Sequence, residues 1–457
     1  MKIVLTIHHF PPNYSAGAEV YTFRLAGWLL KHGHEVEVVC AESVTHQSDN
    51  ELEHRHEIYE NIPVWRLYFN LGRASDPFRW SYDNPAIGDW FAQFLQQMQP
   101  DIVHVNSCYL LSASTITAIK EQRLPLIVTL HDFWFACPRI TLLRPTGALC
   151  RVPEDVAECA WCLATERRRF RWPEMASGGV AGAVAQRMLK LPAGARMLGI
   201  RPGADEIACR RKALMNALNQ AEVILSPSEF LRSIFIEQGI DPAKILYSRY
   251  GLDTSHWLDA SDSEREPSRD LRITYIGQLA PHKGIHLLVK AFNRLDFARR
   301  QARLKIYGDP TVFPDYVESL RQVANSRDGR TAVEFAGRFD NRQVAQILRQ
   351  TDVVVVPSLW YENSPITIME ALTTGTPVAT ANVGGMSELV THNVNGLLFA
   401  VGDVDDLARQ LQRTLDEPNL VTGLAANAQP VRMIDDEMIQ VLSLYERAVR
   451  DNASSPA

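Results

Sequence analysis

The chain has 457 residues, which is too long for a single ordinary hydrophobic core, so we expect two or more domains. Hydrophobic residues make up 46% and charged residues 22%, the balance of a soluble globular protein, and a formal net charge of −6 gives no reason to expect a nucleic acid partner. The sequence has no run of about eighteen apolar residues, which argues against a transmembrane helix.

The N-terminal half begins with the pattern of a doubly wound α/β sheet. Residues 2–7 predict a first strand rather than a signal peptide, because the apolar run is short and is interrupted by His8 and His9. A loop with two prolines and a glycine follows, then a helix with a broad apolar face is expected over 18–31 and a second strand over 35–40. Seven cysteines without an export signal indicate a reducing cytoplasm.

His131 is the first candidate functional residue. Further strands are expected over 101–105 and 126–130, and His131 and Asp132 stand at the end of the second one. Ligands of open α/β sheets bind beyond the carboxyl ends of the strands, so both side chains are expected to point towards a ligand. The alternative for His131 is a capping or core-edge histidine. Residues 41–100 contain a polar insertion and an aromatic stretch to which the sequence assigns no role.

Four cysteines lie close together after this strand. Cys137, Cys150, Cys159 and Cys162 are separated by twelve, eight and two residues in a loop-rich segment. A Cys-x-x-Cys pair with two more thiols, in a segment that lacks its own core, has the composition of a structural zinc site. The spacing slightly favours zinc over four reduced thiols without a metal, and an iron–sulfur cluster is a third alternative.

The next segment is strongly basic. Residues 166–212 carry eleven basic residues against four acidic ones, a net charge of +7 in a chain whose total is −6. Apolar stretches such as 180–184 and 197–200 alternate with the charges. A solvated basic face and a contact with an anionic membrane surface are both consistent with this composition.

The domain organisation follows from composition and pattern. A polar, charged stretch at 259–270 predicts the linker between an N-terminal domain, residues 1–258 with the cysteine-rich and basic inserts at about 137–212, and a C-terminal domain, residues 271–433. A last helix is expected over 434–451, and a disordered tail over 452–457.

The stretch from Asp352 to Thr380 organises the C-terminal domain. Valines 353–356 predict a strand buried on both faces. Ser364 is expected to cap the next helix and Pro365 to occupy its first turn. The first amides of a helix form an anion site. Glu362 precedes the helix and Glu370 lies inside it, so a bound diphosphate would have a carboxylate on each side.

This pair of glutamates, with seven residues between them in a strand–loop–helix, resembles the paired-glutamate motif of the retaining glycosyltransferases of family 4, which have the GT-B fold. The resemblance implies two doubly wound, Rossmann-like domains that face each other across a cleft. It implies a nucleotide-sugar donor on the C-terminal domain and a saccharide or lipid-linked saccharide acceptor on the N-terminal domain. It extends to Lys283 in a glycine-bearing turn, where Gln278 stands in place of the family's arginine, and to Pro11, Gly17 and Glu19 near the N-terminus.

The same resemblance implies roles for individual residues. Lys283 and the amides after Ser364 would neutralise the leaving diphosphate, Glu370 would bind the ribose hydroxyls, and Glu362 and His131 would lie at the donor sugar. The set of residues expected at the donor is completed by Gly17, Gln278, Phe339, Asn363, Ser364, Pro365 and Ile366. No Asp-x-Asp motif stands at the expected place, so no catalytic metal is expected.

These implications predict a retaining hexosyltransferase of cell-surface polysaccharide biosynthesis. The cysteines and the lack of an export signal predict a cytoplasmic location, and the basic segment 166–212 leaves open whether the protein is peripheral on the inner face of the membrane. Two alternatives stay open. One is a non-catalytic nucleotide-sugar-binding protein, which the uncharged Gln278 suggests. The other is a different enzyme on the same fold, such as an epimerase or a phosphorylase, which the glutamate pair disfavours. The resemblance to family 4 also implies that the last predicted helix, residues 434–451, crosses back onto the N-terminal domain.

Overall fold

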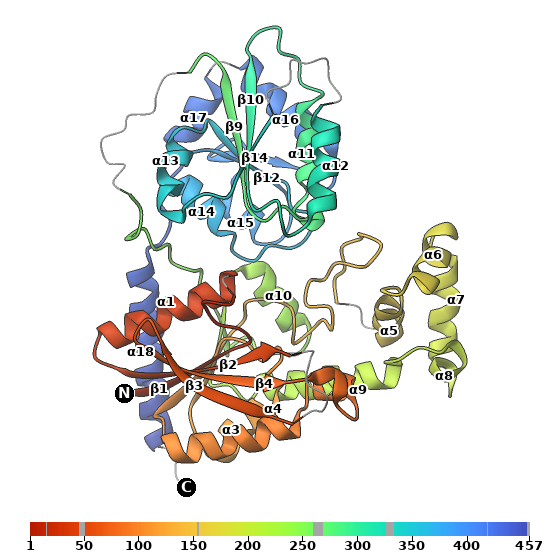
Figure 1. Cartoon of the computed structure of the whole chain (residues 1–457), viewed down its shortest axis with the longest axis vertical. Helices are drawn as coiled ribbons and strands as arrows, with labels where there is room; N and C mark the ends of the chain where they lie inside the picture. The colour runs from red at the N-terminus through yellow and green to blue at the C-terminus, as the bar shows by residue number, and fades with distance from the viewer. Residues whose placement is uncertain are drawn as a thin grey trace. The chain divides into compact units, whose positions relative to one another are not determined.

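The computed structural model shown in Figure 1 describes residues 1–14, 16–44, 51–152, 155–258, 268–325, 333–417 and 419–454. The chain divides into two compact units, one formed by Met1–Ser248 together with Met438–Ala457 and the other by Arg249–Glu437. This division precedes the predicted linker at 259–270, of which 259–267 lies outside the described residues. The linker stays a prediction.

The first unit is built on an eight-stranded sheet with the order β3-β4-β2-β1-β5-β6-β7-β8. All neighbouring strands pair in parallel except β3, which is antiparallel to β4 at the edge. The predicted parallel α/β sheet is therefore confirmed, and the segment left without a role contributes a hairpin to its edge. The strands are β1 (Lys2–Ile7), β2 (Glu35–Ser43), β3 (Glu53–Tyr59), β4 (Ile62–Phe69), β5 (Ile102–Val105), β6 (Leu126–Thr129), β7 (Val223–Ser226) and β8 (Ile245–Tyr247).

Helices follow most of these strands, as in other doubly wound sheets. They are α1 (Gly17–Lys31), α2 (Pro77–Trp80), α3 (Pro85–Met98), α4 (Ser114–Glu121), α5 (Val156–Ala164), α6 (Arg168–Ala176), α7 (Val180–Leu189), α8 (Gly194–Leu198), α9 (Ala204–Leu218) and α10 (Glu229–Glu237). Five of them, α5 to α9, occupy the single connection between β6 and β7, where the cysteine-rich and basic inserts lie.

The last helix, α18 (Ile434–Ser454), begins in the second unit and belongs to the first from Met438 onward. It is held there by a buried hydrogen-bond chain. The imidazole of His104 on β5 makes hydrogen bonds with the Tyr445 hydroxyl at 2.5 Å and with the Thr129 hydroxyl at 2.7 Å. A disordered tail was expected from residue 452 onward, but α18 continues to Ser454. Residues 455–457 lie outside the described part.

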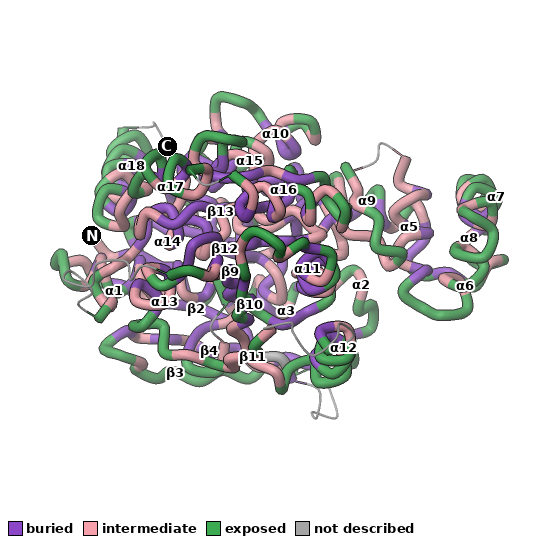
Figure 2. Tube along the Cα trace, turned by 90° about the horizontal axis from the view of Figure 1, so that it is seen from above, coloured by how far each residue is buried: buried purple, intermediate pink, exposed green. Residues whose placement is uncertain are grey.

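The second unit is built on a six-stranded parallel sheet with the order β11-β10-β9-β12-β13-β14. Its strands are β9 (Leu271–Ile276), β10 (Ala302–Tyr307), β11 (Val333–Gly337), β12 (Val353–Val356), β13 (Val378–Ala381) and β14 (Gly396–Phe399). Its helices are α11 (Ile285–Phe292), α12 (Pro314–Ala324), α13 (Val344–Arg349), α14 (Ile366–Thr373), α15 (Met386–Leu389), α16 (Val404–Asp416) and α17 (Leu420–Ala426). β12 and β13 are buried along their length (Figure 2).

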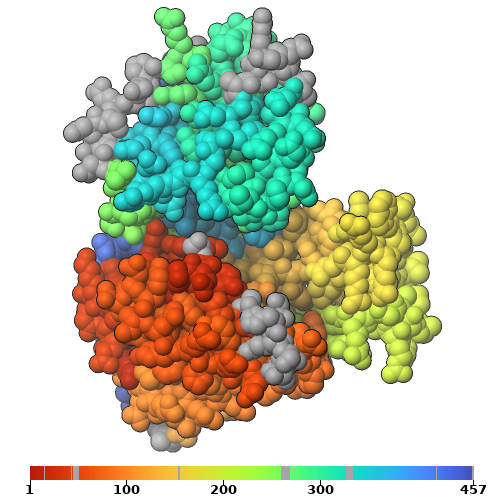
Figure 3. All heavy atoms as spheres, in the orientation of Figure 1, coloured from red at the N-terminus to blue at the C-terminus, as the bar shows by residue number. Residues whose placement is uncertain are grey.

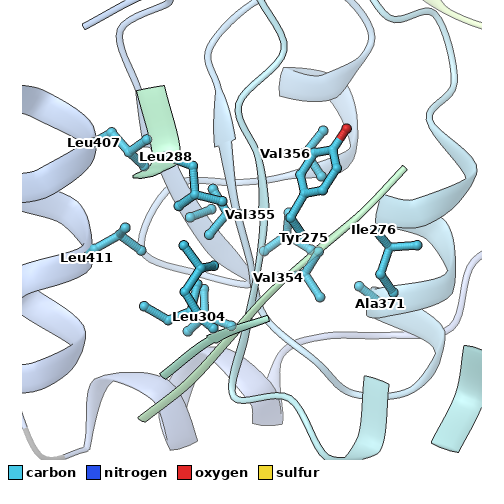
Figure 4. Close-up of a cluster of buried hydrophobic side chains, with 14 of the residues drawn as sticks. Tyr275, Ile276, Leu288, Leu304, Val354, Val355, Val356, Ala371, Leu407 and Leu411 are labelled. Carbon is cyan, nitrogen blue, oxygen red and sulfur yellow. The ribbon is translucent and has the colours of Figure 1, made fainter. Parts of the chain in front are cut away.

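The valine strand forms the centre of this unit's core, as its sequence predicted. All four valines of β12 are buried, and successive side chains point to opposite faces of the sheet. Val355 lies on the side of Leu288 and Leu407, and Val354 on the side of Ala371 in α14 (Figure 4). Helices therefore cover both faces of β12, and the loop that follows it starts from a rigid support. Among the described residues, no helix combines the length and apolar character needed to cross a membrane.

Candidate active site

The carboxylate of Glu362 accepts three side-chain hydrogen bonds at the carboxyl edge of the second unit's sheet. Its Oε1 accepts hydrogen bonds from Lys283 Nζ at 2.6 Å, from Trp360 Nε1 at 2.7 Å and from the Ser358 hydroxyl at 2.9 Å. The side chains of Lys283 and Glu362 are 22% and 15% exposed. The Lys283 ammonium also lies 5.0 Å from the centre of the Trp360 ring, within range of a cation–π interaction.

Two loops bring this pair together, and glycine allows their close approach. Gly284 has φ +72°, and a Cβ there would lie 1.9 Å from the Pro357 carbonyl oxygen. The amide of Leu359 donates to the His282 carbonyl at 2.8 Å, which joins the lysine loop to the loop after β12. Any larger residue at position 284 would force the two backbones apart and separate Lys283 from its partner.

A second glycine packs against the other side of the Glu362 loop. The Gly385 amide donates to the Glu362 carbonyl at 2.7 Å, and a Cβ on Gly385 would lie 1.9 Å from the Asn363 carbonyl oxygen. Glycine, which has no Cβ, can let the backbone approach a ligand closely. Here Gly385 approaches backbone of the chain itself, so it fixes the loop that carries Glu362.

Glu362 is held in its charged form. Burial acts to raise its pKa, but the charge of Lys283 and the hydrogen bonds from Lys283, Trp360 and Ser358 outweigh burial, and the net pKa is lower than the usual 4.5. The carboxylate is therefore an anion at neutral pH. It forms an ion pair with Lys283, the residue predicted to bind the diphosphate.

Helix α14 begins one residue later than expected. Pro365 is its N-cap, with φ −68° and ψ 113°, and Ile366 is its first residue. The prediction that Ser364 caps the helix is wrong, because Pro365 is the N-cap and the Ser364 hydroxyl donates to the Met369 sulfur at 3.4 Å instead of accepting from a backbone amide. The first amides of a helix have no partner inside it, although the Ile368 amide of α14 donates to the Pro365 carbonyl at 3.0 Å, and the anion site here stays a prediction. Glu370 is a partly buried residue in the middle of α14.

The turns after β9 and β10 approach each other closely beside this helix. A Cβ on Gly308 would lie 2.2 Å from the Gly277 carbonyl oxygen, and the Gly277 amide donates to the Tyr307 carbonyl at 3.1 Å. Gln278 follows Gly277 and is exposed, while the Phe339 ring packs edge-on against Tyr307 with centroids 5.6 Å apart. Gln278 is thus accessible to a ligand at the strand ends.

In the first unit, His131 belongs to a polar cluster at the carboxyl ends of three neighbouring strands. Its Nε2 lies 3.5 Å from the side-chain oxygen of Asn106, which follows β5. His8, after β1, pairs with the buried Glu19 of α1 at 3.2 Å, and its ring centroid lies 5.7 Å from that of Tyr109. The parallel order β1-β5-β6 brings the three strand ends to one edge, and a role of His131 at a ligand stays a prediction.

Three buried polar atoms of this cluster have no hydrogen-bond partner among the described residues. They are His8 Nδ1, Glu19 Oε2 and Asn106 Nδ2. Burial, with His104 and His8 as further causes, lowers the pKa of His131 to about 3, so its imidazole is neutral at physiological pH. Buried polar atoms that the protein does not satisfy mark a place where a ligand with hydroxyl groups would gain hydrogen bonds. Gly17 opens α1, and a Cβ added there would meet no atom within 4 Å.

Comparison with known proteins identifies the family to which the two parts of the chain are similar. The family described as Glycosyl transferases group 1 matches residues 259–430, and the Glycosyl transferase 4-like domain matches residues 16–157. Glycogen synthase of Mycobacterium tuberculosis is 25% identical over 423 residues, which cover 92% of this chain and 87% of that protein. The amylovoran biosynthesis glycosyltransferase AmsK of Erwinia amylovora is 28% identical over 249 residues, 51% of this chain and 59% of that one.

Solved structures show the same fold. Anabaena Alr3699/HepE in complex with UDP superposes with a TM-score of 0.65 at 18% identity, covering 98% of this chain and all of that one. Sucrose-phosphate synthase from Thermosynechococcus elongatus has a TM-score of 0.64 at 18% identity, covering 98% of each chain. This chain is a family 4 glycosyltransferase with the GT-B fold.

Sequence reasoning missed several residues of the glycosyltransferase's candidate site. Trp360 and Ser358 bind Glu362, yet neither belongs to the glutamate motif. His8 and Asn106 each follow a parallel strand directly, so the rule that singled out His131 would have found both. No sequence signal identifies Trp360 as a partner of Glu362.

The four cysteines of the glycosyltransferase converge, but they do not form a metal site as they stand. Cys137, Cys150, Cys159 and Cys162 all line one cavity of about 30 Å³ between the loop after β6 and α5, and none forms a disulfide. Within the described part of the chain, no three His, Cys, Asp or Glu side chains are grouped closely enough to hold a metal ion. The structural zinc therefore stays a prediction, supported by the shared cavity alone.

Proposed function

We propose that this glycosyltransferase moves a sugar, most simply a hexose, from a nucleotide-sugar to a saccharide or lipid-linked saccharide, with retention of anomeric configuration. The observation that carries the proposal is the Glu362–Lys283 pair beside the N-terminus of α14. At the carboxyl edge of the sheet, the Glu362 carboxylate could accept hydrogen bonds from sugar hydroxyls. Lys283 and the first amides of α14 supply positive charge beside it. Alr3699/HepE, a structural neighbour, was solved with UDP and with UDP-glucose, which supports a donor of this class.

In the proposed reaction, the bond between the sugar's anomeric carbon and the diphosphate oxygen breaks. An acceptor hydroxyl oxygen forms the new bond to that carbon, and its proton passes to the departing diphosphate. Lys283 and the α14 amides would stabilise the negative charge that develops on the leaving group. Glu370 would accept hydrogen bonds from the ribose diol, since a carboxylate can accept two at once. The chain offers no clear enzymatic nucleophile, so we favour attack from the face that the diphosphate leaves.

The polar cluster of the first unit supports the acceptor and sugar side of the proposal. The unsatisfied atoms of His8, Glu19 and Asn106 offer both donors and acceptors, the mixture that sugar hydroxyls need. A neutral His131 suits the same task, because it can donate from one ring nitrogen and accept at the other. AmsK, a relative whose name assigns it to amylovoran biosynthesis, suggests a role in building a polysaccharide.

The test is a donor screen that reads nucleoside diphosphate release with and without candidate saccharide acceptors, followed by product analysis of the anomeric configuration. We expect release that requires an acceptor and that falls at least tenfold in Lys283→Ala. Lys290→Ala, an exposed lysine on α11, serves as the matched control and should keep full activity. Donor binding without turnover would favour the non-catalytic alternative, and conversion of the donor sugar without transfer would favour an epimerase.

A further inference from the structure

Exposed large apolar side chains are concentrated in one short segment of the chain. Fourteen large hydrophobic residues are exposed among the described residues, and six of them lie between positions 172 and 197. Trp172 is 70% exposed and Met197 is 73% exposed, and the other four are Met175, Val180, Val184 and Leu191. Isolated exposed apolar residues are common on protein surfaces, but a cluster of this density marks an interaction site.

This segment is a helical subdomain, which we call the α6–α8 arm and define as residues 167–201. In Figure 1 its three helices lie with α5 beyond the end of α9, away from the strands of the first unit's sheet. The same segment forms the yellow lobe of Figure 3. The arm has a small core of its own with α5 and α9, formed by Ala157, Ala160, Trp161, Ala164, Ala185, Leu189, Ile200 and Ile207.

The exposed apolar residues do not belong to that core, so packing within the arm gives no reason for apolar side chains at these positions. Trp172 and Met175 are three residues apart on α6, and Val180 and Val184 are four apart on α7, so each pair shares one helix face. None of these four belongs to the buried cluster. The structure therefore leaves an apolar face on each of two helices in contact with solvent.

The charges around these faces are almost all positive. Residues 167–201 contain eight Lys and Arg residues and a single acid, Glu174, which accepts a hydrogen bond from Trp161 Nε1 at 3.1 Å. Arg168 lies one turn before Trp172, and Arg187 lies one turn after Val184. In the described part of the chain, neither arginine forms an ion pair. Apolar and basic groups thus share the same helix faces.

From this combination we infer that the α6–α8 arm docks on an anionic lipid bilayer. Tryptophan, methionine and valine side chains would enter the boundary between headgroups and acyl chains, and the arginines would bind lipid phosphates. A protein partner fits less well, because eight basic residues against one acid would require an equally acidic partner surface. A nucleic acid backbone would leave the apolar side chains without partners. The inference does not depend on the proposed transfer reaction, although a docked arm would suit a lipid-linked acceptor.

The test is flotation of the full chain with vesicles of phosphatidylcholine alone and with vesicles of an equal mixture of phosphatidylcholine and phosphatidylglycerol. We expect binding to the mixed vesicles only, and weaker binding at high salt. Met197→Glu should reduce vesicle binding at least tenfold. Arg168→Glu combined with Arg187→Glu should reduce it by more, since each basic residue contributes roughly fivefold.

The controls use matched residues elsewhere in the first unit. Ile58 on β3 is 72% exposed, so Ile58→Glu introduces the same charge at the same exposure, and Arg73→Glu reverses an exposed charge outside the arm. Both should bind vesicles like the unmodified chain. Circular dichroism and donor turnover of each variant show that folding and catalysis are intact.

Several results would overturn the inference. Recovery of the chain in the soluble fraction with both vesicle types would do so, as would equal binding by Met197→Glu. Self-association without lipid that Met197→Glu abolishes would show that a second copy covers the arm. Retention on a polyanion column that depends on the arginines but not on Met197 would show a polyanion ligand.

Discussion

Removal of the Lys283 ammonium should both destabilise the second unit and slow sugar transfer, and the two effects can be separated. In Lys283→Ala, Glu362 stays buried with only Trp360 and Ser358 as donors. Loss of one partner from a fully buried pair costs about 3–5 kcal/mol. The two side chains are 22% and 15% exposed and two donors remain, so we expect a loss of about 2 kcal/mol in the free energy of unfolding. A loss of that size corresponds to roughly 4–8 °C in Tm for a unit of this length.

The pH dependence identifies the source of this loss. The pKa of Glu362 is lowered in the folded chain, so its pair with Lys283 stabilises the fold above the ordinary glutamate pKa of 4.5, and this stabilisation disappears as the pH falls through the lowered value. The stability difference between the wild type and Lys283→Ala should therefore be full at neutral pH and shrink in acid. Without the lysine, burial remains as the main influence on Glu362 and should raise its pKa.

A double variant separates stability from catalysis. Lys283→Ala combined with Glu362→Gln removes the buried charge along with its partner, so denaturant unfolding should return most of the lost stability. Turnover should stay at least tenfold low, because a charge-assisted contact with the leaving group is worth roughly 1.5–3 kcal/mol. If Lys283→Ala unfolds like the wild type, or if the double variant regains turnover, the reasoning about this pair is wrong.

Three further predictions concern the remaining candidate residues. Glu370→Ala should weaken donor binding at least tenfold in calorimetry, because the ribose loses a charged acceptor, while exposed Glu417→Ala should not; equal affinities would remove Glu370 from the donor site. His131→Ala should lower turnover with little change in Tm, and the wild-type pH profile should show no ionisation of this histidine near pH 6.5, because its pKa is about 3; a variant that unfolds instead would support a structural role. Protein purified without chelator should contain about one zinc per chain if the cysteine cavity closes around a metal, and the absence of zinc and iron would reject that prediction.

The sequence predicted the layered fold well wherever the apolar pattern was strong. The four valines of β12 are buried on both faces, as a central parallel strand requires. The strand β3 was missed because nearly all its side chains are exposed, so its sequence shows no alternation of apolar and polar residues. Its strand conformation becomes evident only from its backbone pairing with β4. The start of α14 was placed one residue early because Ser364 before a proline has the pattern of a cap, whereas the Ser364 hydroxyl bonds to Met369.

The site was predictable as a set of residues but not as a set of contacts. Resemblance to family 4 supplied Lys283, Glu362 and His131, and the rule of strand ends supplied His131 independently. Contacts between residues 79 apart in the chain, such as the bond between Lys283 and Glu362, depend on how two loops pack. That packing rests on Gly284 and Gly385, whose importance appears only when the neighbouring backbone is known.

The ion pair with Glu362 also explains why a lysine suits position 283 before any donor binds. An isolated buried carboxylate is costly, and Lys283 removes that cost in the ligand-free chain. A diphosphate that arrives at α14 would bring more negative charge than Glu362 carries, so it would compete for the same ammonium. As the lysine turns towards the diphosphate, Glu362 loses a donor and needs another, and the hydroxyl groups of the donor sugar are donors of the right kind. Binding of the diphosphate and of the sugar would then be coupled through one lysine, so Lys283→Ala should weaken a nucleotide-sugar by a larger factor than the free nucleoside diphosphate. Equal losses of affinity for the two ligands would show that Lys283 and Glu362 act separately.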